Sequence, residues 1–201
     1  MKTNIIYNSD CIEGLKKLQD ESIDLIVADP PYFKQAFDIM PKQITKLFEI
    51  LKHTFSYIIV DAESSFDAKN IAALTESDAI FLVTIANLPA LRNSQRCLEL
   101  FSKLGFDDNK TKILLNRYME NDEISTKDVE KVIGKPIYWK IPNNYFTMIS
   151  SINKGIPVCK MNPDSNVAKS YRDLALKITD RIYKDNIVQR FENILGGSRG
   201  S

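Results

Sequence analysis

Histidine and cysteine are scarce in this sequence, and their scarcity excludes several kinds of site. His53 is the single histidine in 201 residues, which argues against a Ser-His-Asp triad and against a metal site built from several histidines. The three cysteines, Cys11, Cys97 and Cys159, fit neither a zinc spacing nor a disulfide framework. We therefore predict no metal site, and we expect a protein of the reducing cytoplasm.

Long apolar runs and an excess of charge are also missing. No run approaches the ~20 apolar residues of a membrane-spanning helix, and the polar N-terminus does not resemble a signal peptide. Lys and Arg number 27 while Asp and Glu number 26, so the net charge indicates neither a nucleic-acid nor a membrane partner. With 44% hydrophobic and 26% charged residues, the composition is typical of a soluble globular protein.

Glycine is rare where a phosphate-binding loop would need it. The chain has seven glycines, and none lies between Gly14 and Gly105. A loop that holds phosphates through backbone N–H groups needs closely spaced glycines, and the sequence offers no such loop. The final stretch 196–201, Gly-Gly-Ser-Arg-Gly-Ser, is interpreted as a linker or affinity-tag remnant outside the fold.

The apolar run Ile58-Ile59-Val60 predicts a central strand that is buried on both faces of a parallel sheet. The run ends at Asp61. Ligands of open α/β sheets sit just beyond the carboxyl ends of the strands, so this acid is well placed for chemistry. A cap of the turn or of the next helix is the alternative role, and the local pattern leaves both open.

Strands and helices are expected to alternate along the rest of the chain. Strands are predicted at 5–7, 22–28, 55–60, 78–84, 112–116 and 136–141, and helices at 10–18, 41–51, 67–74, 94–104, 124–133, 145–153 and 165–183. This alternation predicts a single α/β domain over residues 1–195. Its expected architecture is a doubly wound, mostly parallel sheet of about six strands with helices on both faces, Rossmann-like or P-loop-NTPase-like.

The sharpest short motif is Asp29-Pro30-Pro31-Tyr32, which follows the second predicted strand. Together with the text before it, residues 1–33 resemble the catalytic segment of DNA amino-methyltransferases. That resemblance implies methyl transfer from S-adenosylmethionine to adenine N6 or cytosine N4. Asp29 and the Pro30 carbonyl would accept hydrogen bonds from the amino group of a flipped-out base, and Tyr32 would stack on that base.

Residues 41–179 carry a second resemblance, to the C-terminal part of the MinD/ParA-like ATPases, and most closely to the pilus-assembly type of the tight-adherence system. It implies that Asp61 is the Walker B aspartate behind the phosphates. It also implies that Asn116, followed by Arg117, reads the adenine edge and that Pro142 and Asn143 cover the base. The motifs that carry it are Tyr57–Asp61, Ala73–Thr84, Leu88–Asn93, Leu114–Tyr118, Ile141–Asn144 and Ile152–Pro157.

The two resemblances together suggest a chimera, natural or engineered. The family's glycine-rich, lysine-containing phosphate loop has no counterpart here, and the methyltransferase-like segment occupies its place. Pro30 and Pro31 remove two N–H donors and Asp29 adds a negative charge, so this strand end should repel phosphate. We therefore expect no ATP hydrolysis and at most weak nucleoside binding.

The sequence thus favours a catalytically silent MinD/ParA-like α/β protein, a scaffold or protein-interaction module related to pilus assembly. One alternative is an S-adenosylmethionine-dependent DNA amino-methyltransferase, the only reading that implies a nucleic-acid partner. Another is residual binding of an adenine nucleotide as Mg-ATP. Under the leading interpretation no cofactor is expected, and the partner is a second copy of the chain or another protein.

Overall fold

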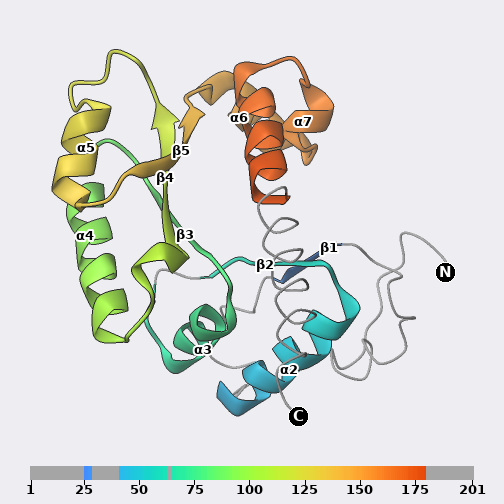
Figure 1. The fold of residues 1–201 in the computed structure, drawn as a ribbon. Coiled ribbons are helices and arrows are strands. Elements are labelled where there is room, and N and C mark those ends of the chain that lie inside the picture. The colour runs from blue at the N-terminus through green and yellow to red at the C-terminus, as the bar shows by residue number, and fades with distance from the viewer. Residues whose placement is uncertain (1–24, 29–40, 63–64, 180–201) are drawn as a thin grey trace, which may run out of the picture. The chain divides into compact units, whose positions relative to one another are not determined.

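The computed structural model describes residues 25–28, 41–62 and 65–179, which fall into two compact units divided after Ile80 (Figure 1). Each unit is described by itself. The predicted strand 5–7, the predicted helix 10–18, the Asp29–Tyr32 motif and the tail 196–201 lie outside the described residues. Whether the chain forms one domain over 1–195 stays a prediction.

The first unit contains a two-stranded parallel sheet. Strand β1 (Leu25–Ala28) pairs with β2 (Tyr57–Val60), and the register runs from Leu25 opposite Tyr57 to Ala28 opposite Val60. Both strands were predicted, and so was their parallel direction. Helix α2 (Pro41–Thr54) precedes β2, so strand, helix and strand form a parallel α/β unit.

Helix α2 was predicted over 41–51, and it buries an apolar face. Phe48 and Leu51 are buried, as is Phe55 just after the helix, and His53 lies in the polar last turn. Helix α3 (Ala68–Glu76) begins at Asp67, whose carboxylate accepts hydrogen bonds from two main-chain amides of the first turn.

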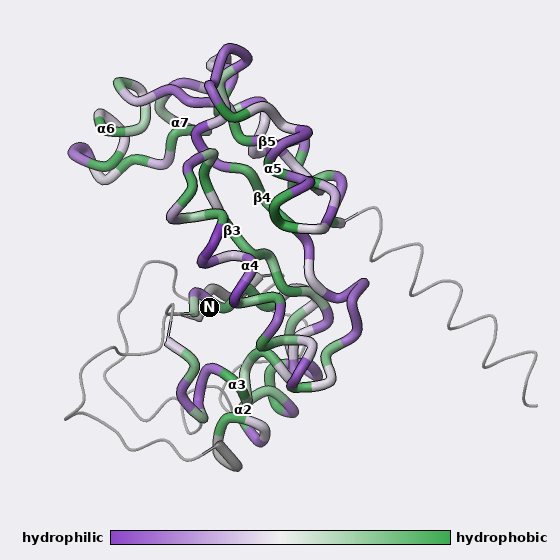
Figure 2. The backbone as a smooth tube through the Cα atoms, turned by 90° about the vertical axis from the view of Figure 1, so that its left-hand side faces the viewer, coloured by the Kyte–Doolittle hydropathy of each residue, from purple (hydrophilic) through white to green (hydrophobic). Residues whose placement is uncertain are grey.

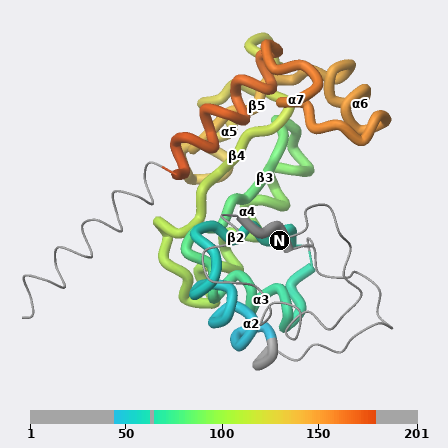
Figure 3. The backbone as a smooth tube through the Cα atoms, turned by 90° about the vertical axis from the view of Figure 1, so that its right-hand side faces the viewer, coloured from blue at the N-terminus to red at the C-terminus, as the bar shows by residue number. Residues whose placement is uncertain are grey.

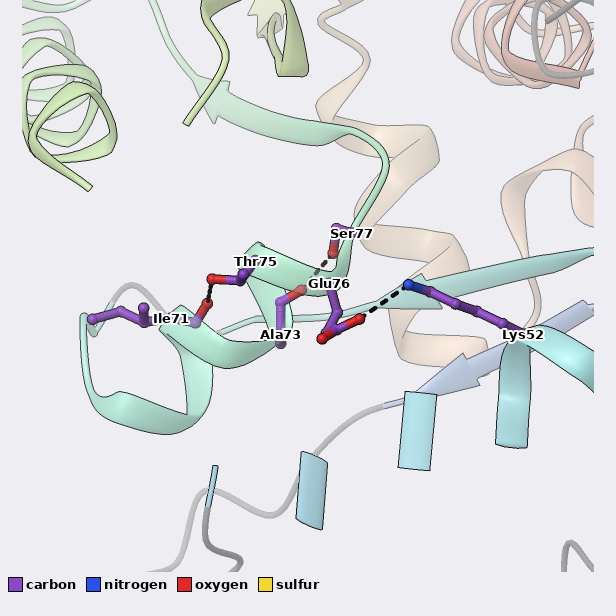
Figure 4. Close-up of polar contacts among 6 residues, drawn as sticks. All are labelled: Lys52, Ile71, Ala73, Thr75, Glu76 and Ser77. Atoms are coloured by element: carbon purple, nitrogen blue, oxygen red, sulfur yellow. Dashed lines mark hydrogen bonds and ion pairs between the residues drawn. The ribbon is translucent and has the colours of Figure 1, made fainter. Parts of the chain in front are cut away.

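An ion pair connects α2 to α3, between Lys52 Nζ and Glu76 Oε2 at 3.1 Å (Figure 4). The side chains are 43% and 25% exposed, so solvent screens the pair and it contributes little to stability. The hydroxyl groups of Thr75 and Ser77 donate to main-chain carbonyls one turn back, so both hydroxyl groups are hydrogen-bonded at the end of α3.

The second unit contains a three-stranded sheet in the order β3 (Ile80–Thr84), β4 (Thr111–Tyr118), β5 (Ile137–Pro142). Strands β4 and β5 are parallel. Ile113, Leu114 and Leu115 are consecutive and all buried, which is typical of a central strand covered on both faces. The parallel α/β architecture is thus confirmed, although the described residues form sheets of two and three strands rather than one of six.

Two helices cover one face of β4 and enclose the main core. Helix α4 (Leu88–Lys103) and helix α5 (Thr126–Ile133) pack on the strand, and β3 and α4 are joined by a loop that ends at the N-cap Asn87. Between α4 and β4 lies a short 3-10 helix (Asp108–Lys110). The fully or nearly buried core residues are Leu91, Ile113, Leu115, Val129 and Ile133, and Figure 2 shows the hydropathy of these elements.

Helix α4 begins earlier than predicted. We expected it from Ser94, whereas it starts at Leu88 because Asn87 caps it, with the Asn87 side chain accepting from the Ala90 amide at 2.9 Å. Pro89 fits the first turn, where its missing N–H has no helical partner to lose. The predicted start at Ser94 was therefore wrong by six residues.

The C-terminal part of the second unit packs on β5 (Figure 3). It comprises α6 (Tyr145–Lys154), the short α7 (Val158–Met161), which the sequence analysis missed, and a helix described over 166–179. A second core cluster joins them through Ile141, Val158, Val167 and Ala168. The indole of Trp139 on β5 also donates to the Ser170 hydroxyl at 3.0 Å.

The β4–β5 ladder contains two register shifts of opposite sense. Ile113 pairs with Ile137 but Leu114 pairs with Trp139, which leaves one extra residue, Tyr138, on β5. Further along, Leu115 pairs with Lys140 and Tyr118 with Pro142, which leaves one extra residue on β4. The second shift therefore restores the register that the first one changed.

Candidate functional site

The carboxyl ends of β4 and β5 bring together four of the five residues for which a nucleotide-binding role was predicted. Asn116 and Arg117 lie near the end of β4, Pro142 ends β5, and Asn143 follows it. Pro142 pairs with Tyr118, and the Asn143 amide donates to the Tyr118 carbonyl at 2.9 Å. The predicted adenine-reading and base-covering segments are therefore neighbours, as the switch-point rule for parallel sheets leads one to expect.

Arg117 gives this edge an unusual backbone. Its φ of 54° is the only positive value among the described residues other than glycine. The left-handed conformation costs a residue with a Cβ of order 1 kcal/mol or more. The extra residue on β4 lies between Leu115 and Tyr118, the stretch that contains Arg117, so the left-handed conformation coincides with the second register shift. The Asn116 side-chain oxygen accepts from the Arg117 amide at 2.9 Å, which satisfies an N–H that leaves the ladder.

Asn116 can therefore donate a hydrogen bond to a ligand through its side-chain nitrogen. Its oxygen already accepts one hydrogen bond. Asn116 is half-buried and Arg117 is exposed, so the edge presents an amide and a guanidinium. The ammonium of Lys140 lies 4.6 Å from the Tyr118 ring centroid and adds a further positive charge.

The loop after β5 is fixed by two asparagines. The Asn143 amide group lies 3.4 Å from the Met119 sulfur. Asn144 caps α6, with its oxygen accepting from the Thr147 amide at 3.4 Å and its nitrogen donating to Asn166 at 3.0 Å. No role was predicted for Met119 or Asn144. The cap of Asn144 could have been read from its place before the helix, but the position of Met119 depends on the fold.

The loop between β4 and α5 encloses a cavity of about 250 Å³ beside this edge. Its lining includes Met119, Glu120, Asp122 and Ile124. The Asp122 carboxylate accepts from the Met119 amide at 3.2 Å and holds the loop in a turn. The loop ends in the N-cap of α5, where Ser125 and Asp128 form a capping box.

Asp61, the fifth predicted residue, follows β2 in the first unit and is exposed. Within the described part of the chain, no group of three or more His, Cys, Asp or Glu side chains could hold a metal ion. Thr84, which ends β3, is buried, and its hydroxyl oxygen has no hydrogen-bond partner among the described residues. The methyltransferase candidates Asp29, Pro30, Pro31 and Tyr32 lie outside the described residues, so their roles stay predictions.

No helix in the described ranges is both long and apolar enough to cross a membrane. The three described glycines end helices with positive φ values, namely 76° at Gly105 after α4, 77° at Gly134 after α5 and 62° at Gly155 after α6. All three therefore have structural roles at helix ends.

Comparisons with known proteins point to one group of ATPases. No family model matches the chain. The septum site-determining protein MinD of Thermotoga maritima is 27% identical over 191 residues, which cover 89% of this chain and 69% of that protein. Since 89% is more than residues 41–179 make up, the similarity extends beyond the segment for which it was predicted.

Solved structures agree. A ParA family ATPase from Chlorobium tepidum TLS superposes with a TM-score of 0.67 at 32% identity, covering 73% of this chain and 60% of that one. MinD complexed with Mg-ADP from Pyrococcus horikoshii OT3 gives a TM-score of 0.58 at 21% identity over 69% of this chain and 56% of that chain. A MinC:MinD complex from Aquifex aeolicus gives a TM-score of 0.59 at 17% identity, covering 68% of this chain and 59% of that one.

The chain spans less than two thirds of each of these three solved chains. None of the four proteins is a methyltransferase or is named for pilus assembly. The MinD/ParA resemblance that the motifs carried is confirmed at the level of the fold. The C-terminal part of the chain is homologous in fold to the MinD/ParA-like ATPases.

Proposed function

We propose that this chain is a MinD/ParA-like protein-interaction module that does not itself hydrolyse ATP. The observation that carries the proposal is the use of glycine. Gly105, Gly134 and Gly155 each end a helix, and the remaining glycines, Gly14 and those of the tail 196–201, are not part of a glycine- and lysine-rich loop. A phosphate loop needs closely spaced glycines whose backbone can approach the phosphates, and none of the glycines of this sequence lies in such a loop.

The sequence Asp29-Pro30-Pro31 supports the same proposal. The resemblance places Asp29-Pro30-Pro31 where the phosphate loop of the ATPases would lie. Proline has no N–H to donate, and a carboxylate repels a triphosphate. A chimera that carries a methyltransferase-like segment accounts for this stretch of sequence, and we include such a chimera in the proposal.

A protein partner is the role that remains for such a module. A relative of the same fold has been solved as a MinC:MinD complex. In this chain the start of α4 presents an exposed Leu88, 56% accessible, next to the exposed Arg92. An apolar side chain beside a guanidinium is typical of contact surfaces between proteins. We propose that the module acts in the cytoplasm and, following the branch it resembles most, in pilus assembly.

The test is ATP turnover by the purified full chain with Mg²⁺. We expect no phosphate release above that of a buffer blank. Asp61→Asn serves as the matched variant, because it keeps the size of the side chain and removes the charge expected of a Walker B aspartate. Turnover by the wild-type chain that Asp61→Asn abolishes would overturn the proposal. Turnover unchanged in Asp61→Asn would indicate a contaminating ATPase.

A second candidate function, weak adenine-nucleotide binding without hydrolysis, is favoured by the meeting of Asn116, Arg117, Pro142 and Asn143 at one edge. A relative has been solved with Mg-ADP. The matched variant is Asn116→Asp, which keeps an oxygen for the Arg117 amide but loses the NH2 donor. Asn109→Asp, at an exposed position in the short 3-10 helix before β4, is the control.

A thermal-shift series measures this binding, because a ligand that binds the folded state raises the melting temperature. We expect Mg-ADP at millimolar concentration to raise it in the wild type and in Asn109→Asp but not in Asn116→Asp. S-adenosylmethionine and S-adenosylhomocysteine form the other arm of the series. A shift with these two alone would favour the methyltransferase alternative and direct mutagenesis to Asp29 and Tyr32.

A further inference from the structure

We propose that the exposed face of α6 docks an amphipathic helix of another protein, one whose apolar stripe is flanked by acidic side chains. The inference rests on the proposed role as an interaction module and gives the partner a chemistry. It is carried by an exposed apolar face on a firmly held helix, by the lysines beside that face and by the absence of acidic residues around it. All of these features lie within the second unit.

The exposed face of α6 consists of Tyr145, Phe146 and Ile152, whose exposed fractions are 62%, 82% and 67%. Phe146 is the most exposed of the large apolar side chains among the described residues. Tyr145 and Ile152 are seven residues apart, so they lie on one side of the helix at a spacing of about 10 Å along its axis. A stripe of that length matches the anchors that one amphipathic helix presents at positions i, i+3, i+4 and i+7.

The opposite side of α6 is firmly held by the rest of the second unit. Met148 packs against the second core cluster, and the buried Ser151 donates its hydroxyl hydrogen to the Ile156 carbonyl. On the exposed side, the rings of Tyr145 and Phe146 meet edge to face at 5.5 Å. The aromatic pair is therefore oriented before a partner arrives, and a preorganised surface loses less side-chain entropy on binding.

The sequence around this face carries positive charge only. Residues 137–163 contain Lys140, Lys154 and Lys160 and neither Asp nor Glu, although the whole chain has 26 acidic residues. Lys154 ends α6 and Lys160 lies in α7, and both are exposed. Neither of these two forms an ion pair with any other described residue. Carboxylates beside the apolar stripe of a partner would therefore be attracted to this face.

The same charges argue against two other occupants. A second copy of this face would place lysines against lysines, and like charges across an interface disfavour association. A lipid surface would be held weakly by three lysines, because juxtamembrane segments that bind anionic lipid usually carry about four to eight Lys or Arg. An acidic amphipathic helix complements both the apolar stripe and the lysines.

The test is fluorescence anisotropy of a labelled synthetic peptide with the full chain, without nucleotide. The peptide is helical and has leucines at i, i+3, i+4 and i+7 with glutamates on both sides of that stripe. We expect saturable binding that weakens with salt and a Kd that rises roughly tenfold for Phe146→Ser. Leu176→Ser is the matched control, because Leu176 is also an exposed apolar residue (61%), on the helix 166–179.

Circular dichroism melts of the two variants establish that each is folded. Because Phe146 is largely exposed, we expect Phe146→Ser to melt as the wild type does. Absence of binding to the wild type, or equal effects of Phe146→Ser and Leu176→Ser, would overturn the proposal.

Charge reversal tests the lysines without removing an apolar group. Lys154→Glu with Lys160→Glu should weaken binding of the acidic peptide roughly tenfold and should strengthen binding of a matched peptide with lysines in place of its glutamates. The control is Lys127→Glu with Lys131→Glu on α5, which lies away from α6 in Figures 1 and 3. It changes the net charge equally and should leave both affinities nearly unchanged. Equal effects of the two double variants would overturn the proposal.

A lipid surface and a second copy of the chain are the alternative occupants, and Phe146→Ser distinguishes them. Sedimentation with phosphatidylserine vesicles that is lost in this variant, without peptide binding, would assign the face to a membrane and overturn the proposal. Self-association that is lost in this variant, again without peptide binding, would assign the face to a second copy and also overturn it. None of these measurements depends on ATP turnover, so the inference and the proposed function can fail separately.

Discussion

The ammonium of Lys177 donates a hydrogen bond of 3.2 Å to the carbonyl oxygen of Tyr138, and the same ammonium lies 4.1 Å from the Tyr138 ring centroid. Tyr138 is the extra residue on β5, where the ladder with β4 shifts. A carbonyl displaced from a ladder needs another donor, and the helix 166–179 supplies it from outside the sheet. Lys177 thus joins the last described helix to the irregular point of β5.

Replacing Lys177 should therefore weaken the second unit. We expect Lys177→Met to lower the free energy of unfolding by about 1 kcal/mol, since it removes one hydrogen bond and the exposed cation–π contacts with Tyr138 and Trp139 but keeps the aliphatic stem. Chemical denaturation measures the change. Lys169→Met on the same helix is the control and should be nearly neutral; equal losses in the two variants would contradict the role of Lys177.

The backbone of Arg117 gives a prediction with an unusual sign. Because φ is 54°, Arg117→Gly should keep or raise the melting temperature, whereas the β-branched Arg117→Val should cost about 1–2 kcal/mol. Lys127→Gly, on the exposed side of α5, is the matched control and should cost about 1 kcal/mol because its backbone is helical. A destabilised Arg117→Gly would contradict a left-handed conformation at this position.

Two leucines on α4 separate burial from helix propensity. Leu91 is fully buried and Leu88 is 56% exposed. We expect Leu91→Ala to cost about 2–5 kcal/mol and Leu88→Ala less than about 1 kcal/mol. Urea denaturation followed by circular dichroism distinguishes these values. Similar costs for both would mean that α4 does not pack on β4 through Leu91.

The capping box of α5 makes stability depend on pH. Hydrogen bonds from Ser125 lower the pKa of Asp128 below its ordinary value. A carboxyl whose pKa is lower in the folded state stabilises the fold above its unfolded pKa, and this stabilisation is lost as the pH falls through the folded pKa. Ser125→Ala should cost about 1 kcal/mol at neutral pH, and its difference from wild type should shrink in acid. Melting curves from pH 7 to pH 3 measure this, and a constant difference would contradict the assignment.

Burial also raises the pKa of the Cys97 thiol on α4. The thiolate is the reactive form, so Cys97 should react with a thiol reagent more slowly at pH 8 than free cysteine does, and at the free rate after denaturation. Mass spectrometry of the labelled peptides resolves Cys97 from the other cysteines. Labelling of Cys97 at the free rate in the native protein would show that its side of α4 is open.

Sequence patterns predicted the elements well where local chemistry decides them. The run Ile58–Val60 forms a strand and residues 41–51 lie in a helix, as expected from their patterns. The predicted burial of that strand on both faces was wrong, because Ile59 is 53% exposed. The start of α4 was misplaced, since Pro89 reads equally as a break or as a first-turn residue until the cap at Asn87 is known. The short α7 carries no periodic signal of its own.

The candidate site was predicted as residues and not as an arrangement. Asn116 and Asn143 could be named from their motifs, but their meeting depends on the β4–β5 register, which contains two shifts. No local sequence pattern predicts the positive φ of Arg117, because arginine has no preference for the left-handed conformation. The contact between Met119 and Asn143 likewise depends on the pairing of distant segments.

The paired register shifts also bear on how these two strands tolerate changes of length. Because Tyr138 is the extra residue, deleting it leaves Trp139 opposite Leu114 and Lys140 opposite Leu115, so the later side chains of β5 keep their faces, including the buried Ile141. Deleting Arg117 likewise leaves Tyr118 opposite Pro142. Each strand can therefore lose its extra residue without turning its other side chains over, whereas deletion of a paired residue such as Leu114 would turn the residues after it toward the opposite face.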